Sequence, residues 1–192
     1  QKASYYHINL IKLLNRKKFK KCLFIGKHFK MLESKIISGI SCSKEEAKIT
    51  LTGVDDKPGV AAGIFGPLSE SGINVDMIIQ NISENNSTDL TFSCPSSQVL
   101  AAEEAIKMAS KKKEISFKTH IIDTNVAKVS LVGIGMRSHT GIAKKMFEAL
   151  ANENINILVI STSEIKISIL VEQKYMELAV QTLHDAFELE KP

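Results

Sequence analysis

Two glycine-containing turns carry the residues best suited to hold a charged ligand. They are residues 54–61 (VDDKPGVA) and residues 135–143 (GMRSHTGIA). Each follows a β-like segment and precedes a helix-like one, so each presents free backbone N–H groups at a helix N-terminus. Those donors and the helix dipole favour a carboxylate by about 0.3 to 1 kcal/mol at an exposed site. Both turns are therefore candidate carboxylate sites, although Asp-x-Pro-Gly is also an ordinary helix-start turn.

Polar residues within two apolar segments form a second candidate set. They are Asn74, Asp76 and Gln80 in the first segment and Asn156, Ser161, Thr162, Ser163 and Glu164 in the second. Buried polar groups need hydrogen-bond partners. These side chains either satisfy one another across a dimer seam or contact a small zwitterion, and their spacing fits both interpretations. Asp56 has two interpretations as well, as a helix cap or as the partner of a ligand's ammonium group.

No residue pattern predicts a catalytic centre, a metal site or a cofactor. The five histidines lack metal-ligand spacing, and the chain contains neither a Gly-x-Ser-x-Gly elbow nor a phosphate-binding glycine loop. The three cysteines, Cys22, Cys42 and Cys94, are too far apart for a Cys-x-x-Cys pair. We therefore expect no catalytic residue, no metal and no cofactor, in a reducing, cytoplasmic environment.

Charge is distributed unevenly along the chain. The 192-residue sequence has a formal charge of +4, with 44% hydrophobic and 24% charged residues. Residues 1–30 hold nine of the 25 basic residues and no acidic one, which leaves 16 basic against 21 acidic residues in the remainder. We therefore expect an acidic folded part behind a basic leader, residues 1–30, that has no assigned role. No apolar run approaches the roughly 18 residues of a membrane span. Neither nucleic acid nor a membrane is an expected partner.

A repeat of about 70 residues organises the chain. Residues 47–54 (AKITLTGV) match residues 127–134 (AKVSLVGI) class for class, and residues 73–75 (INV) match residues 155–157 (INI). Two-residue alternation predicts strands and helical spacing predicts helices. The first copy reads as strand, helix, two strands, helix and strand, at residues 48–54, 60–68, 73–82, 88–94, 97–110 and 114–122. That βαββαβ order is the ferredoxin-like motif.

The second copy lacks its last strand. Its predicted elements occupy residues 126–134, 140–151, 155–162, 165–171 and 173–187. Residues 35–43 are β-like and have no place in the first copy. Because an unpaired sheet edge is a liability, we expect this segment to add to the second sheet. The expected fold is α+β with two interleaved domains, one of residues 47–122 and one of residues 35–43 plus 125–189.

Three stretches resemble the C-terminal regulatory part of bacterial aspartate kinases, and the resemblance covers about residue 31 to the end. They are residues 55–83 (DDKPGVAAGIFGPLSESGINVDMIIQNIS), 127–171 (AKVSLVGIGMRSHTGIAKKMFEALANENINILVISTSEIKISILV) and 183–189 (LHDAFEL). The resemblance implies two ACT domains that bind threonine and/or lysine. Such binding restrains aspartate kinase, the first step of the pathway to lysine, threonine and methionine. It also implies a homodimer, or pairing with a kinase-containing chain, as in family members whose small β subunit is this region.

The resemblance also implies which residues contact the effector and that the family's kinase activity is missing from this chain. The effector-binding residues carried over position by position are Asp56, Lys57, Pro58, Gly59, Val60, Ala61, Asn74, Val75, Asp76, Gln80, Ile142, Ala143, Asn156, Ile157, Ser163 and Glu164. Thr140 departs from the family, which has Pro or Ala there. No Lys-Phe-Gly-Gly-Thr type motif of the family's kinase domain occurs, so this chain alone is expected to be unable to phosphorylate aspartate.

Two other functions share the βαββαβ order. An acylphosphatase needs an Arg in the first strand-to-helix loop and an Asn on a neighbouring strand, and Arg137 with Asn156 could supply these in one copy only. An RNA-binding module needs exposed aromatic residues on its central strands, and the two central segments offer only Phe92. The acidic folded part also argues against RNA.

Overall fold

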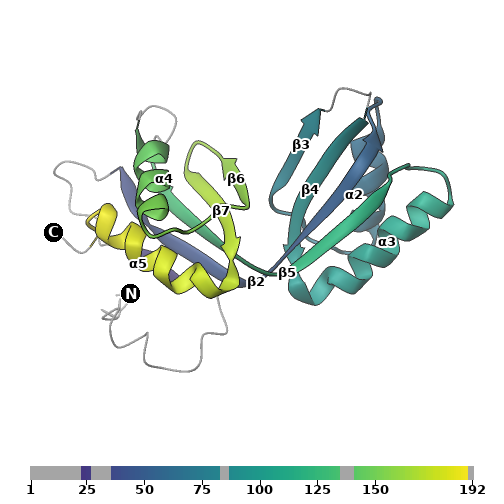
Figure 1. Cartoon of the computed structure of the whole chain (residues 1–192). Coiled ribbons are helices and arrows are strands. Elements are labelled where there is room, and N and C mark those ends of the chain that lie inside the picture. Colours follow the sequence, from purple (N-terminus) through teal and green to yellow (C-terminus); the bar gives the residue numbers. More distant parts are fainter. Residues whose placement is uncertain (1–22, 27–35, 83–86, 135–140, 190–192) are drawn as a thin grey trace, which may run out of the picture.

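The computed structural model describes residues 23–26, 36–82, 87–134 and 141–189. Its strands are β1 (Leu23–Gly26), β2 (Ile37–Asp55), β3 (Ile78–Ile82), β4 (Ser87–Pro95), β5 (Thr119–Gly133), β6 (Val159–Thr162) and β7 (Lys166–Glu172). Its α-helices are α2 (Val60–Glu70), α3 (Val99–Lys111), α4 (Ile142–Asn152) and α5 (Met176–Ala186), and short 3-10 turns precede α3 and α5. The strands form one antiparallel sheet in the order β3-β4-β2-β5-β7-β6, with β1 paired to β2. Figure 1 shows this sheet as two halves that meet in a V.

The long strands β2 and β5 each run through both halves of the sheet. In the first half, residues 46–55 of β2 pair with β4 and with residues 119–123 of β5. In the second half, residues 37–43 of β2 pair with residues 128–133 of β5, which also pairs with β7. The pairing expected for the segment before the first repeat is therefore confirmed over residues 37–43.

The separate strands predicted on either side of the two junctions are wrong, because the structure joins them. Residues 43–46 (SKEE) and 123–125 (DTN) contain neither Gly nor Pro, so nothing in them forces the chain to turn. Irregular register between Ser43 and Lys48 takes up the change of direction instead. Such bulges bend a strand and increase its twist, which lets one pair of strands serve two half-sheets.

Each half has its own hydrophobic core between its sheet and its two helices. In the first half, buried Ile49 and Leu51 of β2 pack with Ile64 and Leu68 of α2 and with the Ala-rich face of α3. The second core repeats this plan, with buried side chains of β5, β7, α4 and α5 that include Val129, Leu131, Ile169, Met146, Leu150 and Leu183. Alternation along the strands and helical spacing along the helices account for both sets. Figure 1 shows the helix pairs on the outer sides of the V and β3 and β6 toward its inside.

Three strands begin later than predicted: those expected at residues 73–82, 114–122 and 155–162 start at Ile78, Thr119 and Val159. The strand predicted at residues 73–82 is ordered as β3 only from Ile78, although Asp76 N–H donates to Ser93 O and Ser93 N–H donates to Met77 O. Residues 23–26, within the unassigned leader, form β1 and pair with residues 39–42 of β2. This pairing covers an otherwise open edge of the second half-sheet. None of the helices in the described ranges is long and apolar enough to cross a membrane.

Candidate functional site

The turn before α2 offers backbone donors to a ligand. Gly59, not Asp56, occupies the N-cap position, with φ 92° in the left-handed region. A Cβ at Gly59 would meet nothing within 4 Å, so glycine is needed there for its backbone angle rather than for space. Val60 N–H donates to Lys57 O (3.2 Å) and Gly63 N–H to Gly59 O (3.0 Å). Within the described chain, the N–H groups of Ala61 and Ala62 remain as the free donors of this helix start.

The second turn repeats this arrangement at α4. Gly141 is the N-cap with φ 99°, and its carbonyl accepts the N–H of Lys145 at 2.9 Å. Ile142 is buried in the second core and Ala143 packs against that core. Arg137 and Thr140 lie outside the described residues. Both turns therefore lead into a helix N-terminus, as the repeat in the sequence predicts, and in both the N-cap is a glycine.

The loop before β3 lies at the other end of the first half-sheet. Asn74 is exposed, and its N–H donates to Gln98 Oε1 (3.1 Å), while Gln98 Nε2 donates to Gly72 O (3.3 Å). Val75 packs against the first core. Gln98 thus holds this loop against the start of α3. Asn74 acts here through its backbone, which leaves its side chain exposed to a ligand or a partner.

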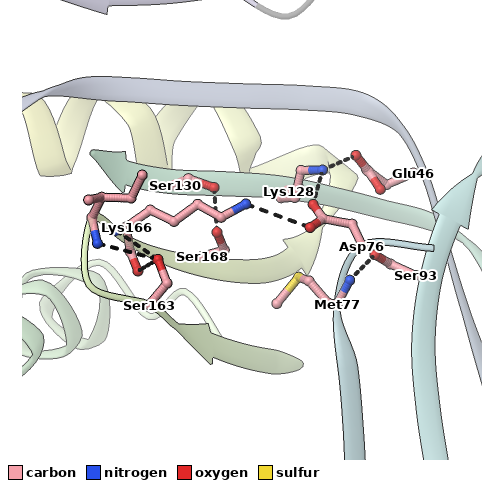
Figure 2. A network of polar contacts seen from close by, with 10 residues as sticks. Glu46, Asp76, Met77, Ser93, Lys128, Ser130, Ser163, Lys166 and Ser168 are labelled. Carbon is pink, nitrogen blue, oxygen red and sulfur yellow. Dashed lines mark hydrogen bonds and ion pairs between the residues drawn. The ribbon is translucent and has the colours of Figure 1, made fainter. Parts of the chain in front are cut away.

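Asp76 takes part in a group of charged residues that spans the two halves, which we call the ion-pair cluster: Glu46, Asp76, Lys128 and Lys166. Lys128 Nζ lies 2.6 Å from Glu46 Oε1 and 2.8 Å from Asp76 Oδ2, and Lys166 Nζ lies 3.6 Å from Asp76 Oδ1. Figure 2 shows the two lysine side chains reaching Asp76 from different strands. Next to them, the buried hydroxyls of Ser130 and Ser168 are hydrogen-bonded at 2.8 Å.

Burial and charge oppose each other in this cluster. Partial burial favours the neutral form of Asp76, but the hydrogen bond and charge of Lys128 and the charge of Lys166 outweigh it and lower the pKa of Asp76 below its ordinary 3.8. Burial likewise disfavours the charged form of Lys128, yet its hydrogen bonds to Asp76 and Glu46 raise the pKa of Lys128 above 10.5. Both groups are therefore charged at neutral pH. The cluster holds two acids and two bases and is locally neutral.

The structure does not bring the predicted contacts of the first copy together within one chain. Asp55 of β2 pairs with Ser87 at one end of β4, whereas Asp76 bonds to Ser93 near the other end. Six residues of strand separate these points, a distance of about 20 Å. The helix-start residues 56–61 and Asp76 therefore lie at opposite ends of the half-sheet. Gln80 lies between them, exposed on the edge strand β3.

The second copy divides in the same way. Gly133 N–H donates to Ile165 O at 2.9 Å, which places the β6–β7 turn, with Ser163 and Glu164, at the α4 end of the half-sheet. Leu158 bonds to Leu170 at the opposite end, next to Asn156 and Ile157. The predicted set is again split between two ends.

Ser163 has a structural task inside its turn. Its hydroxyl accepts the N–H groups of Lys166 (3.1 Å) and Ile165 (3.4 Å), and its own N–H donates to Lys166 O (2.8 Å). Figure 2 shows Ser163 bonded to Lys166 in this way. Ser163 therefore stabilises the hairpin, and Glu164 beside it is exposed.

An open groove of about 360 Å³ separates the two halves. One wall comes from β2, β3 and β4 and the other from the start of β6, and the lining residues are Lys48, Thr50, Ile79, Asn81, Thr91, Ile157, Leu158, Val159 and Ile160. Of the predicted effector contacts, Ile157 belongs to this lining. Thr50 and Thr91 bond to each other through their hydroxyls at 2.9 Å, so much of the polar wall is already satisfied.

The RNA-binding alternative fails on Phe92. Its side chain is 1% exposed and meets the ring of Phe65 edge-on, with centroids 5.5 Å apart. A base cannot stack on a buried ring. Of the acylphosphatase pair, Asn156 is exposed and Arg137 lies outside the described residues.

Sequence reasoning missed Glu46, Lys128 and Lys166. A signal existed, because each lysine stands inside an otherwise apolar strand, AKVSLV for Lys128 and EIKISIL for Lys166. Their common partner, Asp76, is far away in sequence, so no local spacing joins them.

Comparison with known proteins places these features in a family. Residues 48–107 and residues 129–187 each match the ACT domain family. The aspartate kinase of Pseudomonas fluorescens is 54% identical over 161 residues, which are 84% of this chain and 38% of that protein. This chain therefore spans well under half the length of that relative.

Two crystal structures extend the match to nearly whole chains. One, of aspartokinase alpha and beta subunits, has a chain that is 46% identical with a TM-score of 0.73, over 80% of this chain and 99% of that one. The other, the ligand-free regulatory subunit of aspartate kinase from Thermus thermophilus, is 37% identical with a TM-score of 0.74 over the same shares. The chain therefore belongs to the aspartokinase family, and it is the regulatory part of aspartate kinase with its two ACT domains.

Proposed function

We propose that this chain binds an end product of the aspartate pathway, threonine and/or lysine, and thereby exerts feedback inhibition on an aspartate kinase. The observation that carries the proposal is the glycine-capped start of α2, where Ala61 and Ala62 offer free N–H groups to a carboxylate. The start of α4, with Ile142 and Ala143, offers a second position of the same kind. The proposed domains are residues 47–122 and residues 35–43 plus 125–189, in a cytoplasmic protein.

We further propose that the effector site is completed by a second chain. Within one chain the helix-start residues and Asp76 lie at opposite ends of β4, about 20 Å apart. The edge strand β3 lies between these ends. If two copies join antiparallel along β3, a two-fold axis places the helix start of one copy beside Asp76 of the other. Gln80, exposed on β3, then lies at the seam and can read a side-chain hydroxyl such as that of threonine.

The partner is proposed to be a second copy or a kinase-containing chain. Edge strands tend to be paired or covered, and aspartokinase alpha and beta subunits occur together in one related structure. Phosphorylation of aspartate is assigned in this proposal to the family's kinase domain, on which the regulatory part acts. Effector binding changes activity only if it favours one arrangement of the parts over another, by about 1 to 3 kcal/mol in typical systems.

Calorimetric titration tests the proposal. The purified chain is titrated with threonine and with lysine, and alanine serves as the matched amino acid that lacks both a side-chain hydroxyl and an ammonium group. The proposal expects saturable heat with threonine or lysine and none with alanine. Equal heats, or no heat, with all three amino acids would overturn it.

A further inference from the structure

The ion-pair cluster divides by charge along the boundary between the two halves. Both acids belong to the first half, since Glu46 pairs with Pro95 of β4 and Asp76 precedes β3. Both bases belong to the second half, since Lys128 pairs with Leu170 and Lys166 with Val132. The contacts of Lys128 and Lys166 with Asp76 therefore cross from one half to the other. Figure 2 shows them at the place where β5 passes between the halves.

Apart from the continuous strands β2 and β5, the apolar contact between the two halves is small. The two large cores are separate, and the cluster that joins them is small: Met77, Val126, Val159 and Leu170, with Ile79 and Leu158 at its margin. Met77 directly follows Asp76, and Val159 and Ile79 line the groove. A change at Asp76 therefore acts on the small apolar contact and on the groove at once.

The groups that bind Asp76 are the side-chain ammonium groups of Lys128 and Lys166. An amino-acid effector also carries an ammonium group. Lys166 is the weaker of the two holders, at 3.6 Å with 43% of its side chain exposed, whereas Lys128 is 19% exposed and also bonds to Glu46. Replacing Lys166 at Asp76 by an effector's ammonium exchanges one cation for another, so it leaves no buried charge unpaired. That exchange needs no new anion in the site.

We propose that Lys166 is a positioning residue of regulation: it holds Asp76 across the boundary between the halves, and an effector's ammonium displaces it and loosens that boundary. This inference rests on the proposed function, because it takes an amino-acid effector as the competitor. In this inference Lys128 stays bound to Asp76 when the effector binds, and Lys166 is replaced by the effector's ammonium group.

The informative variant is Lys166→Met, which keeps the length and apolar body of the side chain and removes its charge. Lys128→Met is less informative, because it leaves the buried Glu46 without its cation. The matched control is Lys107→Met, which removes the cation of an ion pair with Glu103, one turn back along α3. Two readouts are compared for the wild-type chain and both variants: effector affinity by calorimetry and hydrogen exchange of residues 74–79 by mass spectrometry.

If Lys166 competes with the effector, Lys166→Met binds threonine or lysine about two- to fivefold more tightly than the wild-type chain, since a partly exposed ion pair contributes up to about 1 kcal/mol. Its amides at residues 74–79 exchange faster without effector, as those of the wild-type chain do with effector. Lys107→Met changes neither readout. Unchanged or weaker binding by Lys166→Met, or exchange that the effector does not alter in the wild-type chain, overturns this inference. Failure of the wild-type chain to bind either amino acid overturns the proposed function instead.

Discussion

Lys128 and Asp76 are 52 residues apart in the sequence, and Lys128 Nζ lies 2.8 Å from Asp76 Oδ2. This ion pair joins β5 in the second half to the loop before β3 in the first. It places one of the predicted effector contacts in a bond that already spans the molecule. An effector that binds Asp76 would therefore also contact the ion pair that links the two ACT domains.

Gln80→Ala tests the placement of the effector site at the β3 edge. If Gln80 reads a ligand hydroxyl at a desolvated seam, its loss leaves that group unpaired and weakens threonine binding by about 1 to 3 kcal/mol, or from about fivefold to more than a hundredfold. Glu164→Ala weakens lysine binding similarly if the side-chain ammonium is read there. Lys112→Ala, beyond the C-terminal end of α3, leaves both affinities unchanged. Calorimetry gives all of these values, and parental affinity in both Gln80→Ala and Glu164→Ala would show that these residues are structural.

Gly59→Ala tests whether the left-handed N-cap matters to the fold. Space is open around Gly59, so the only cost of a methyl group is the positive φ, about 1 to 2 kcal/mol in the free energy of unfolding. Asn adopts positive φ more readily than Ala, so Gly59→Asn recovers part of the loss. Urea denaturation of the two variants beside the wild-type chain measures both effects. Equal stability of Gly59→Ala and the wild-type chain would contradict the strained geometry.

Acid should weaken the boundary between the halves through Asp76. The pKa of Asp76 is lower in the folded chain than its ordinary 3.8, so the folded chain binds fewer protons there than the unfolded chain does. The stabilisation is thus present above about pH 4 and is lost as the pH falls through the lowered value. Solvent screens this partly exposed group, so the contribution stays below about 1 kcal/mol.

The measurement for Asp76 is urea denaturation at pH 6 and at pH 3 for the wild-type chain and for Asp76→Asn. The variant has no carboxyl to protonate, so it loses less stability between the two pH values than the wild-type chain does. Asp185→Asn, an exposed change on α5, serves as the control. An identical loss in the wild-type chain and Asp76→Asn would contradict the ion-pair assignment.

Cys94 should resist thiol reagents in the folded protein. Burial, followed by the nearby charge of Glu46, raises the pKa of its thiol to about 11, and its side chain is 1% exposed. At pH 8 about one thiol in a thousand is then ionised, and the thiolate is the reactive form. A chain with Cys22→Ser and Cys42→Ser leaves Cys94 as the sole thiol. It should react with a disulfide reagent only after unfolding, and rapid reaction of the native chain would contradict the burial of Cys94.

The repeat in the sequence was enough to predict most of the elements and the crossing of residues 37–43 into the second half. Alternation at Ile49 and Leu51 and helical spacing at Ile64 and Leu68 are local signals, and the structure follows them. The continuity of β2 and β5 was not predictable in this way, because the junctions contain Ser43, Asp123 and Asn125, residue types that are common in turns. Only the packing of the two halves decides whether each junction is a turn between two strands or part of one continuous strand.

The candidate site was predictable in part. The two helix starts follow from turns that recur in the repeat, but the cap of the first helix is Gly59 and not Asp56, the residue that the sequence offered as a cap. The partners of Asp76 did not follow, because Glu46, Lys128 and Lys166 come from three separate segments that only the folded sheet brings together. The split of the predicted contacts between two ends of each half also depends on strand direction, which residue types alone do not fix.

A crystal structure of this chain with bound threonine or lysine would show whether a second chain completes the effector site. We expect a symmetric pair of chains joined along β3. The effector's carboxylate should lie on the N–H groups of Ala61 and Ala62 in one chain, and its ammonium should face Asp76 of the second chain, with Lys166 displaced. An effector bound within a single chain, or in the groove between the halves with the contacts of Asp76 unchanged, would contradict an effector site shared by two chains.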